Sequence, residues 1–216
     1  MNTRRQFVIR FSRFLAGLGL AIHPVFSYVG RALAAARRRI LPKDTDLQSL
    51  KNENPSALDT RHLEVMPIES FRTMGIDDYA VSLEQWRLEV TGKVKHPLRL
   101  TYAELLSLPA LEENVLLICP GIFTIHAHWK GVAVAVILKQ AGPQEGVSQV
   151  TLHGPQGPYE KVEAFKMDEV ASGKVFLAYG VNGQTLPQKH GFPLRAVAAD
   201  RFGSDWVKFV YKLEAR

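Results

Sequence analysis

Cys119 is the single cysteine of the chain and the residue with the most distinctive chemistry. It follows the apolar run Val115-Leu-Leu-Ile, which has the length of a buried strand and ends at Pro120 and Gly121. A lone cysteine cannot form an intramolecular disulfide, and in an oxidising compartment its thiol would oxidise or cross-link unless something occupies it. The alternative is a buried cysteine that serves only as a small hydrophobic residue.

Two further motifs carry candidate chemistry. His126 and His128 form a His-x-His pair, which a strand would place on one face, within reach of Zn²⁺ or of a cavity at Cys119. The pair is open to three interpretations: a hydrogen-bonded or exposed pair, a role beside the substrate, or a separate metal site. Tyr159, in Gly157-Pro-Tyr, is a candidate catalytic proton donor, with a packed loop tyrosine as the alternative.

The elements that position these residues are predicted to be mostly strands. Apolar and polar residues alternate, or run together, as strands require at 86–91, 98–100, 115–119, 147–153, 175–179, 193–198 and 206–213. Short helices are predicted at 132–140, at 165–170 and after Thr101, where Thr101 and Glu104 form a capping-box pattern. Residues 154–159 and 183–191 are expected to be loops. The predicted fold class is α+β, mostly β.

Length and charge set the domain organisation. The 216 residues suffice for one domain and an appendage. Residues 1–40 hold eight arginines and no acid, so subtracting 8 from the net charge of +6 leaves −2 for residues 41–216. Because the positive charge belongs to the amino terminus, we expect no nucleic-acid binding by the remainder.

The amino terminus has the layout of an export signal. Arg4 and Arg5 precede Phe7 and an apolar stretch at 14–30, and Thr-Arg-Arg-x-Phe-Val resembles the twin-arginine signal. Cleavage at the small residues 32–36 and retention as an inner-membrane anchor both stay open, and a basic amphipathic helix on the inner leaflet is a third alternative. We therefore expect a leader at 1–36, a linker or strap at 37–60 and one periplasmic domain at 61–216.

Five motifs occur along this domain in one order: Trp86-Arg-Leu-Glu-Val-Thr-Gly, Val115-Leu-Leu-Ile-Cys-Pro-Gly, Trp129-Lys-Gly-Val, Gly191-Phe-Pro-Leu-Arg and Arg201-Phe-Gly-Ser-Asp-Trp-Val-Lys. Together they resemble the molybdopterin-binding domain of the sulfite oxidase family, in the bacterial periplasmic branch related to the catalytic subunit of the periplasmic methionine sulfoxide reductase system. The resemblance covers residues 60–216. It implies a molybdenum-molybdopterin cofactor with Cys119 as the one protein ligand of the metal, which suits a soft thiolate donor.

The resemblance also implies a set of cofactor contacts: Phe71, Arg72, Thr73, Cys119, His190, Arg195, Gly203, Ser204 and Lys208. The planar guanidinium of Arg195 suits a phosphate or pterin, with a structural salt bridge as the alternative. The residues after Cys119, at 120–123, differ from the patterns common in the family. The resemblance therefore leaves the substrate open.

The function that the resemblance implies is a periplasmic molybdenum oxidoreductase. It would carry out oxygen-atom transfer or a related two-electron reaction on a small or sulfur-containing substrate. A non-catalytic periplasmic binding protein of the same fold and an unrelated β-rich periplasmic binding protein are the alternatives. With one cysteine the chain has no Cys-x-x-Cys-His haem motif, so electrons must pass through a partner. The resemblance implies a membrane haem protein or a cytochrome, besides the twin-arginine export machinery.

Overall fold

The computed structural model describes residues 38–157 and 160–216. The predicted leader at 1–36 and the candidate Tyr159 lie outside these ranges. The chain divides into two compact units, 1–39 and 40–216, and the second contains the elements described below. Within the described ranges, no helix has the length and apolar character needed to cross a bilayer.

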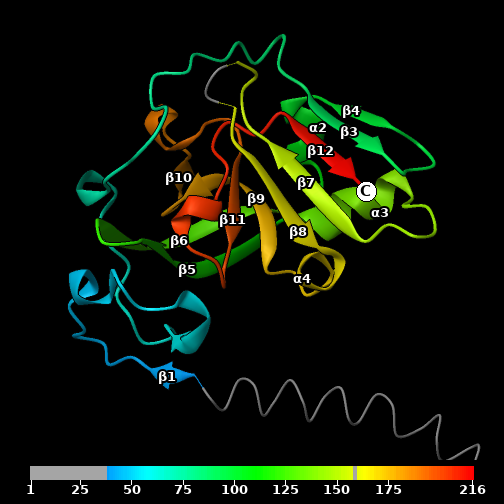
Figure 1. Ribbon diagram of the computed structural model, residues 1–216. Coiled ribbons are helices and arrows are strands. Elements are labelled where there is room, and N and C mark those ends of the chain that lie inside the picture. Colours follow the sequence, from blue (N-terminus) through cyan, green and yellow to red (C-terminus); the bar gives the residue numbers. More distant parts are fainter. Residues whose placement is uncertain (1–37, 158–159) are drawn as a thin grey trace, which may run out of the picture. The chain divides into compact units, whose positions relative to one another are not determined.

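The first of two five-stranded sheets has the order β10-β9-β6-β5, with β11 antiparallel to β9 (Figure 1). Its strands are β5 (Leu111–Cys119), β6 (Phe123–Ala133), β9 (Val175–Val181), β10 (Gln184–Thr185) and β11 (Arg195–Ala198). β5 and β6 form a hairpin in which Cys119 pairs with Phe123. At the bulge in β6, a Cβ on Gly131 would lie 2.3 Å from the Leu177 carbonyl oxygen, so only glycine permits the close approach of β9.

The second sheet has the order β4-β3-β12-β7-β8. Its strands are β3 (Leu88–Gly92), β4 (Leu98–Leu100), β7 (Gln149–His153), β8 (Val162–Lys166) and β12 (Lys212–Ala215). The carboxy-terminal β12 lies parallel to β3 and antiparallel to β7. Leu88 and Val90 of β3 are fully buried and alternate with half-buried polar residues, as the sequence pattern predicts.

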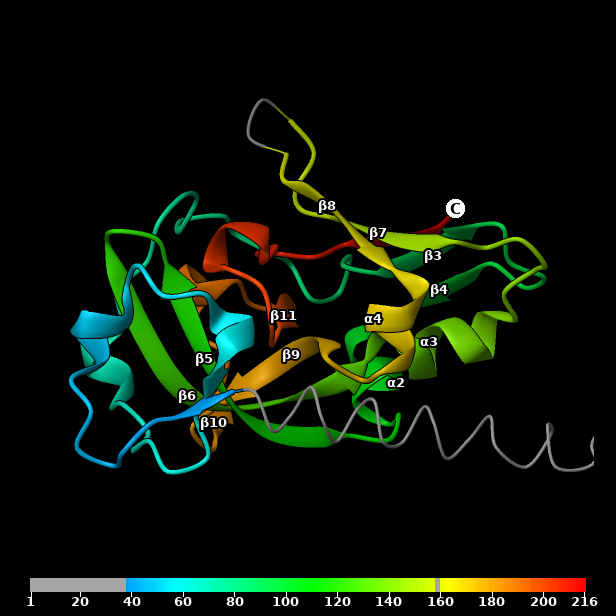
Figure 2. The same cartoon turned by 60° about the horizontal axis from the view of Figure 1, so that its bottom comes forward.

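Three short α-helices accompany these sheets: α2 (Tyr102–Leu106), α3 (Val134–Ala141) and α4 (Met167–Ala171). The predicted capping box of α2 is confirmed, because Thr101 Oγ1 accepts the Glu104 N–H at 3.2 Å and the Glu104 carboxylate accepts the Thr101 N–H at 2.8 Å. α3 and α4 both contact β9, and in the view of Figure 2 they lie below the strands of the second sheet. The predicted class, α+β and mostly β, is confirmed.

The segment before the second sheet packs on the outer face of β5. It contains β1 (Arg39–Ile40), η1 (Leu47–Leu50), η2 (Pro55–Ala57), β2 (Leu58–Asp59) and η3 (Ile68–Ser70). Its buried leucines form a second apolar cluster with Leu116 and Ile118, whereas Val115 and Leu117 face the main core. The Gly121 N–H donates to the Lys51 carbonyl at 2.9 Å. This segment therefore supports the turn that follows Cys119.

Three predicted elements are wrong or incomplete. The strand predicted at 206–213 is replaced by irregular backbone up to β12, since Phe209 has a positive φ of 56° where the chain passes between the two sheets. The helix predicted at 165–170 begins at Met167, because residues 162–166 pair with β7 as β8. The expected loop at 183–191 contains β10 and the 3₁₀ turn η4 (Gln188–His190). β6 was not predicted, since its mixed polar and apolar residues give no clear period.

Candidate functional site

Cys119 lies at the end of β5, where the strand leaves the core, and its side chain is partly exposed. Its Sγ atom is 3.5 Å from the Met74 sulfur. The cysteine opens into a cavity of about 480 Å³. The cavity is lined by Met74, Gly75, Ile76, Cys119, Pro155, Glu160, Lys161, Gly203, Ser204, Trp206, Lys208 and Phe209. Most of its wall is therefore apolar, and the charged residues in it are Glu160, Lys161 and Lys208.

Arg195 begins β11 and is 8% exposed. Its Nη1 donates to the His190 carbonyl at 3.0 Å, and its guanidinium lies 5.5 Å from the Trp206 ring centre and 5.8 Å from that of Trp129. Its Nε atom has no hydrogen-bond partner. No carboxylate among residues 38–157 and 160–216 forms an ion pair with it. Burial lowers the pKa of Arg195 to about 10. Buried charges in proteins are normally paired with an opposite charge, and the described residues provide none for Arg195.

His190 and Lys208 lie close to Arg195. Burial, followed by the positive charges of Arg195, Lys189 and Lys208, lowers the pKa of His190 to about 4. Its Nε2 atom is buried without a partner, and its ring stands edge-on to Phe71 with ring centres 5.6 Å apart. Burial also lowers the pKa of Lys208 to about 8, and Arg195 acts in the same direction. His190 is therefore neutral at pH 7, whereas the positive charges of Arg195 and Lys208 repel each other, as expected of a site that binds an anion.

Residues before β3 complete this cluster. Thr73 Oγ1 accepts a hydrogen bond from Lys208 Nζ at 3.0 Å and donates to the Lys189 carbonyl at 3.2 Å. Arg72 donates to the Ile122 carbonyl at 3.3 Å, in the turn after Cys119. Burial raises the pKa of the Cys119 thiol, while the charges of Arg72 and Arg195 lower it. Burial has the larger effect, so the pKa of the thiol is raised overall, and the two arginines offset part of the cost of forming the thiolate that binds a metal.

Gly203 and Ser204 belong to the 3₁₀ turn η5 (Gly203–Asp205), which lies against β5. A Cβ on Gly203 would lie 2.9 Å from Leu117 Cδ2 and 3.3 Å from the Ile118 carbonyl oxygen. The absence of a side chain at this position lets η5 approach the strand that carries Cys119. η5 thus forms part of the cavity wall beside the cysteine.

The structure places the predicted cofactor residues around this one region, although they come from four separate segments of the sequence. Gly203, Ser204 and Lys208 line the cavity with Cys119, and Phe71, Thr73, His190 and Arg195 are joined to them by the contacts above. Sequence reasoning missed Met74, Trp206 and Phe209. Met74 directly follows the predicted Thr73, whereas the other two were assigned to a regular strand.

Both histidines of the His-x-His pair form hydrogen bonds with neighbouring groups. His126 is fully buried on β6, and its Nδ1 lies 3.0 Å from the Glu64 carbonyl oxygen. His128 Nδ1 lies 2.8 Å from the Asn114 amide oxygen and its Nε2 lies 3.0 Å from Glu112. Over the ranges that the structure describes, no group of three or more His, Cys, Asp or Glu side chains is arranged to hold a metal ion. The separate metal site considered above is therefore not supported.

Comparisons with known proteins identify relatives. Residues 76–216 match the family model described as "Oxidoreductase molybdopterin binding domain". The chain is 32% identical over 145 residues to the protein-methionine-sulfoxide reductase catalytic subunit MsrP of Gluconobacter oxydans (strain 621H), covering 59% of this chain and 46% of that one. It is 32% identical over 120 residues to the uncharacterized oxidoreductase YuiH of Bacillus subtilis (strain 168), covering 55% of this chain and 59% of that one.

Among solved structures, the sulfane dehydrogenase SoxCD from Paracoccus pantotrophus is similar, with a TM-score of 0.58 and 25% identity. That match covers 63% of this chain and 39% of the other. The chain thus spans about half the length of the curated relatives it matches.

Proposed function

This chain belongs to the oxidoreductase molybdopterin binding domain family, and from that membership together with its leader sequence we propose that it is a periplasmic molybdenum oxidoreductase. The reaction we propose is oxygen-atom transfer, or a related two-electron transfer, on a small sulfur-containing substrate. The observation that carries the proposal is Arg195, a buried cation without a counter-ion in the cluster beside Cys119.

The residues present fit the cofactor that the family implies. A molybdopterin has an anionic phosphate and a polar pterin, and both need donors. Arg195 Nε is buried and has no partner among the described residues, and the lowered pKa of Lys208 reflects a second desolvated cation beside it. The neighbouring positive charges also help to keep His190 neutral. An anion bound here would restore the electrostatic balance of the cluster. Cys119 supplies the soft thiolate that a metal with sulfur ligands requires.

Within this arrangement each residue has a defined task. Cys119 would bind the metal, which stabilises the thiolate, and the charges of Arg72 and Arg195 would offset part of the burial that raises the pKa of the thiol. Arg195, His190 and Lys208 would orient the cofactor through their donors. The cofactor, when bound, supplies the two-electron and oxygen-transfer chemistry that no side chain of this chain provides.

The composition of the cavity wall indicates which class of substrate it would accept. Met74, Ile76, Trp206 and Phe209 form its apolar side and would exclude water from the reacting sulfur. Lys161, which also lines it, already pairs with Glu163 at 2.9 Å. This lining supports a neutral organic sulfur compound, such as a sulfoxide or thioether, over an inorganic anion such as sulfite.

The test compares the wild-type protein with Cys119→Ser, both purified from the periplasm. We expect about one molybdenum and one pterin per wild-type chain, and reduction of a sulfoxide by reduced viologen dye. Because a serine hydroxyl is a poor ligand at neutral pH, Cys119→Ser should retain its fold and lose molybdenum and activity. A full molybdenum complement in Cys119→Ser would refute the assigned ligand. A loaded wild-type chain without turnover would favour the non-catalytic binding protein.

The cellular location is a separate proposal that rests on the sequence of the leader. Arg4 and Arg5 support export of the folded protein by the twin-arginine machinery, and a haem protein or cytochrome is the proposed electron partner. Replacing both arginines with lysine should leave the protein in the cytoplasm with its leader attached, as cell fractionation would reveal. Normal periplasmic accumulation of the double variant would indicate another export route.

A further inference from the structure

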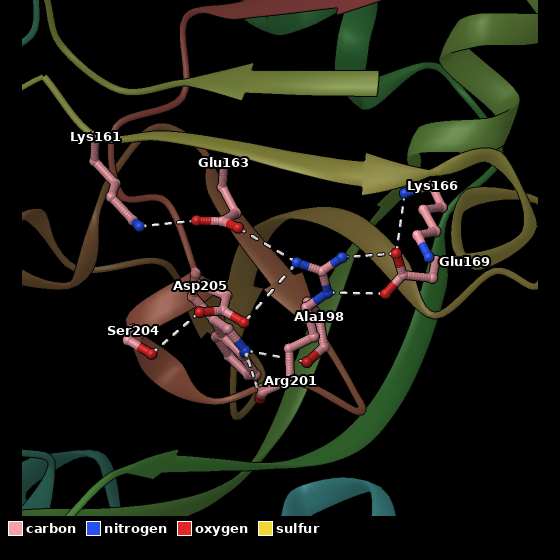
Figure 3. Close-up of polar contacts among 9 residues, drawn as sticks. Lys161, Glu163, Lys166, Glu169, Ala198, Arg201, Ser204 and Asp205 are labelled. Carbon is pink, nitrogen blue, oxygen red and sulfur yellow. Dashed lines mark hydrogen bonds and ion pairs between the residues drawn. The ribbon is translucent and has the colours of Figure 1, made fainter. Parts of the chain in front are cut away.

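Arg201 lies at the centre of the polar network drawn in Figure 3. Its Nε and Nη2 donate to the two carboxylate oxygens of Glu169, at 2.8 Å and 2.7 Å. Its Nη1 donates to Glu163 at 3.3 Å and lies 3.9 Å from the Asp205 carboxylate. The guanidinium also stacks 4.6 Å from the centre of the Phe165 ring. We call Arg201 with Glu163, Glu169 and Asp205 the Arg201 clamp.

The clamp joins parts of the two sheets. Glu163 lies on β8 and Glu169 on α4, which belong with the second sheet, whereas Arg201 and Asp205 lie in the segment after β11 of the first sheet. Arg201 is three-quarters buried on its side chain, so water screens these ion pairs less than it screens surface pairs. A bidentate guanidinium–carboxylate pair also fixes orientation, which a single contact does not.

The segment that the clamp holds is the one that shapes the cofactor cavity. Gly203 and Ser204 of η5 lie between the clamp and β5, where Gly203 packs against Leu117. The Trp206 indole N–H donates to the Arg201 carbonyl at 3.3 Å and to the Ala198 carbonyl at 3.1 Å. The same indole ring lies 5.5 Å from the Arg195 guanidinium. The backbone of Arg201 therefore contacts the ring beneath Arg195, and its side chain anchors the segment that leads into η5.

We propose that Arg201 is a positioning residue for molybdopterin binding: through Glu163 and Glu169 it fixes η5 and Trp206 against the site without itself lining the cavity. The inference rests on the proposed function, because it takes the cavity to be the cofactor site. Residues that hold a metal ligand in place without touching the metal typically contribute about ten- to a hundredfold to metal affinity.

Two variants separate positioning from simple electrostatics. Arg201→Gln removes a positive charge near an anionic ligand, and Glu169→Gln removes a negative one. Electrostatics alone would weaken cofactor binding in Arg201→Gln and strengthen it in Glu169→Gln. Positioning predicts that both variants bind the cofactor more weakly, since each breaks the bidentate pair. The measurement is the first-order rate of molybdenum loss from purified holoenzyme during dialysis, together with the pterin content per chain.

We expect that rate to rise about tenfold in both variants, which corresponds to a free-energy barrier to molybdenum loss that is lower by about 1.4 kcal/mol. Lys174→Gln is the matched control, because it removes a positive charge and the ion pair between Lys174, directly before β9, and Asp200, which directly precedes Arg201. Glu163→Gln breaks the longer contact of Arg201 together with the ion pair between Glu163 and Lys161, and it serves as the milder variant if the other two do not fold. The melting temperature of the cofactor-free form is measured alongside each rate.

A lower melting temperature with a wild-type rate of molybdenum loss in both variants would mean that the clamp only stabilises the fold. Slower loss in Glu169→Gln would mean that charge alone governs binding. Either result overturns the inference while leaving the proposed function intact. A wild-type chain that holds no molybdenum would overturn both proposals.

Discussion

Replacing Arg195 tests whether its buried charge serves the cofactor or the fold. The fall of its pKa to about 10 corresponds to about 3 kcal/mol of unfavourable burial in the cofactor-free protein. Arg195→Met removes this cost, but it also loses two cation–π contacts and the hydrogen bond to His190, at about 1 kcal/mol each. The free-energy cost of burying the charge and the free energy of the three lost contacts nearly cancel. The unfolding free energy of cofactor-free Arg195→Met should therefore stay within about 1 kcal/mol of wild type.

Cofactor binding should respond very differently. Arg195→Lys retains a positive charge but not the planar fork of donors, and loss of a charge-assisted contact costs about 1.5–3 kcal/mol. That figure corresponds to roughly ten- to hundredfold weaker binding of the cofactor. Both Arg195 variants should therefore be purified folded and depleted of molybdenum. The assay is molybdenum per chain, set against the urea unfolding of the cofactor-free form.

Arg99→Lys is the control, since Arg99 is 72% exposed on its side chain and lies 3.8 Å from Glu89 at the edge of the second sheet. It should keep wild-type molybdenum and stability. A structural ion pair at Arg195 would behave in the opposite way, because removing one partner of a buried pair costs about 3–5 kcal/mol. Wild-type molybdenum in Arg195→Lys combined with a lowered unfolding midpoint would refute the cofactor role.

Two further predictions concern neighbours of Arg195. The pKa of His190 is lower in the folded chain than in the unfolded one, so the unfolded state takes up the proton first. The cofactor-free protein should then lose about 3 kcal/mol of stability as the pH falls from 7 to 4, and His190→Asn should reduce that loss in urea titrations at the two pH values. An equal loss in the variant would assign the effect to other groups. Gly203→Ala would press a methyl group against buried Leu117, so we expect about 1–3 kcal/mol lower stability and less bound molybdenum. Wild-type values of both quantities would show that η5 can move.

Local sequence signals predicted the elements whose cause is itself local. The Thr101–Glu104 capping box sets the start of α2, and period-two burial sets β3, because both depend on residues only a few positions apart. The elements that were mispredicted depend on distant partners. Residues 162–166 form β8 because β7 pairs with them, and the apparent strand at 206–213 is interrupted where the chain crosses between sheets. The alternation of apolar and polar residues does not indicate where the chain crosses from one sheet to the other.

The candidate site divides in the same way. The sequence by itself determined that Cys119 is the one thiol, that it ends a buried strand, and that the motifs around it occur in a family order. It could not determine that Arg195 lacks a carboxylate partner among the described residues, that Met74 lies 3.5 Å from the cysteine sulfur, or that Arg201 forms an ion pair with Glu169. Those properties depend on side chains that lie 32 to more than 100 residues apart in the sequence and come together in the same buried region. The burial of each group and the charges that pair with it depend on which residues meet in that region, so only the tertiary structure decides them.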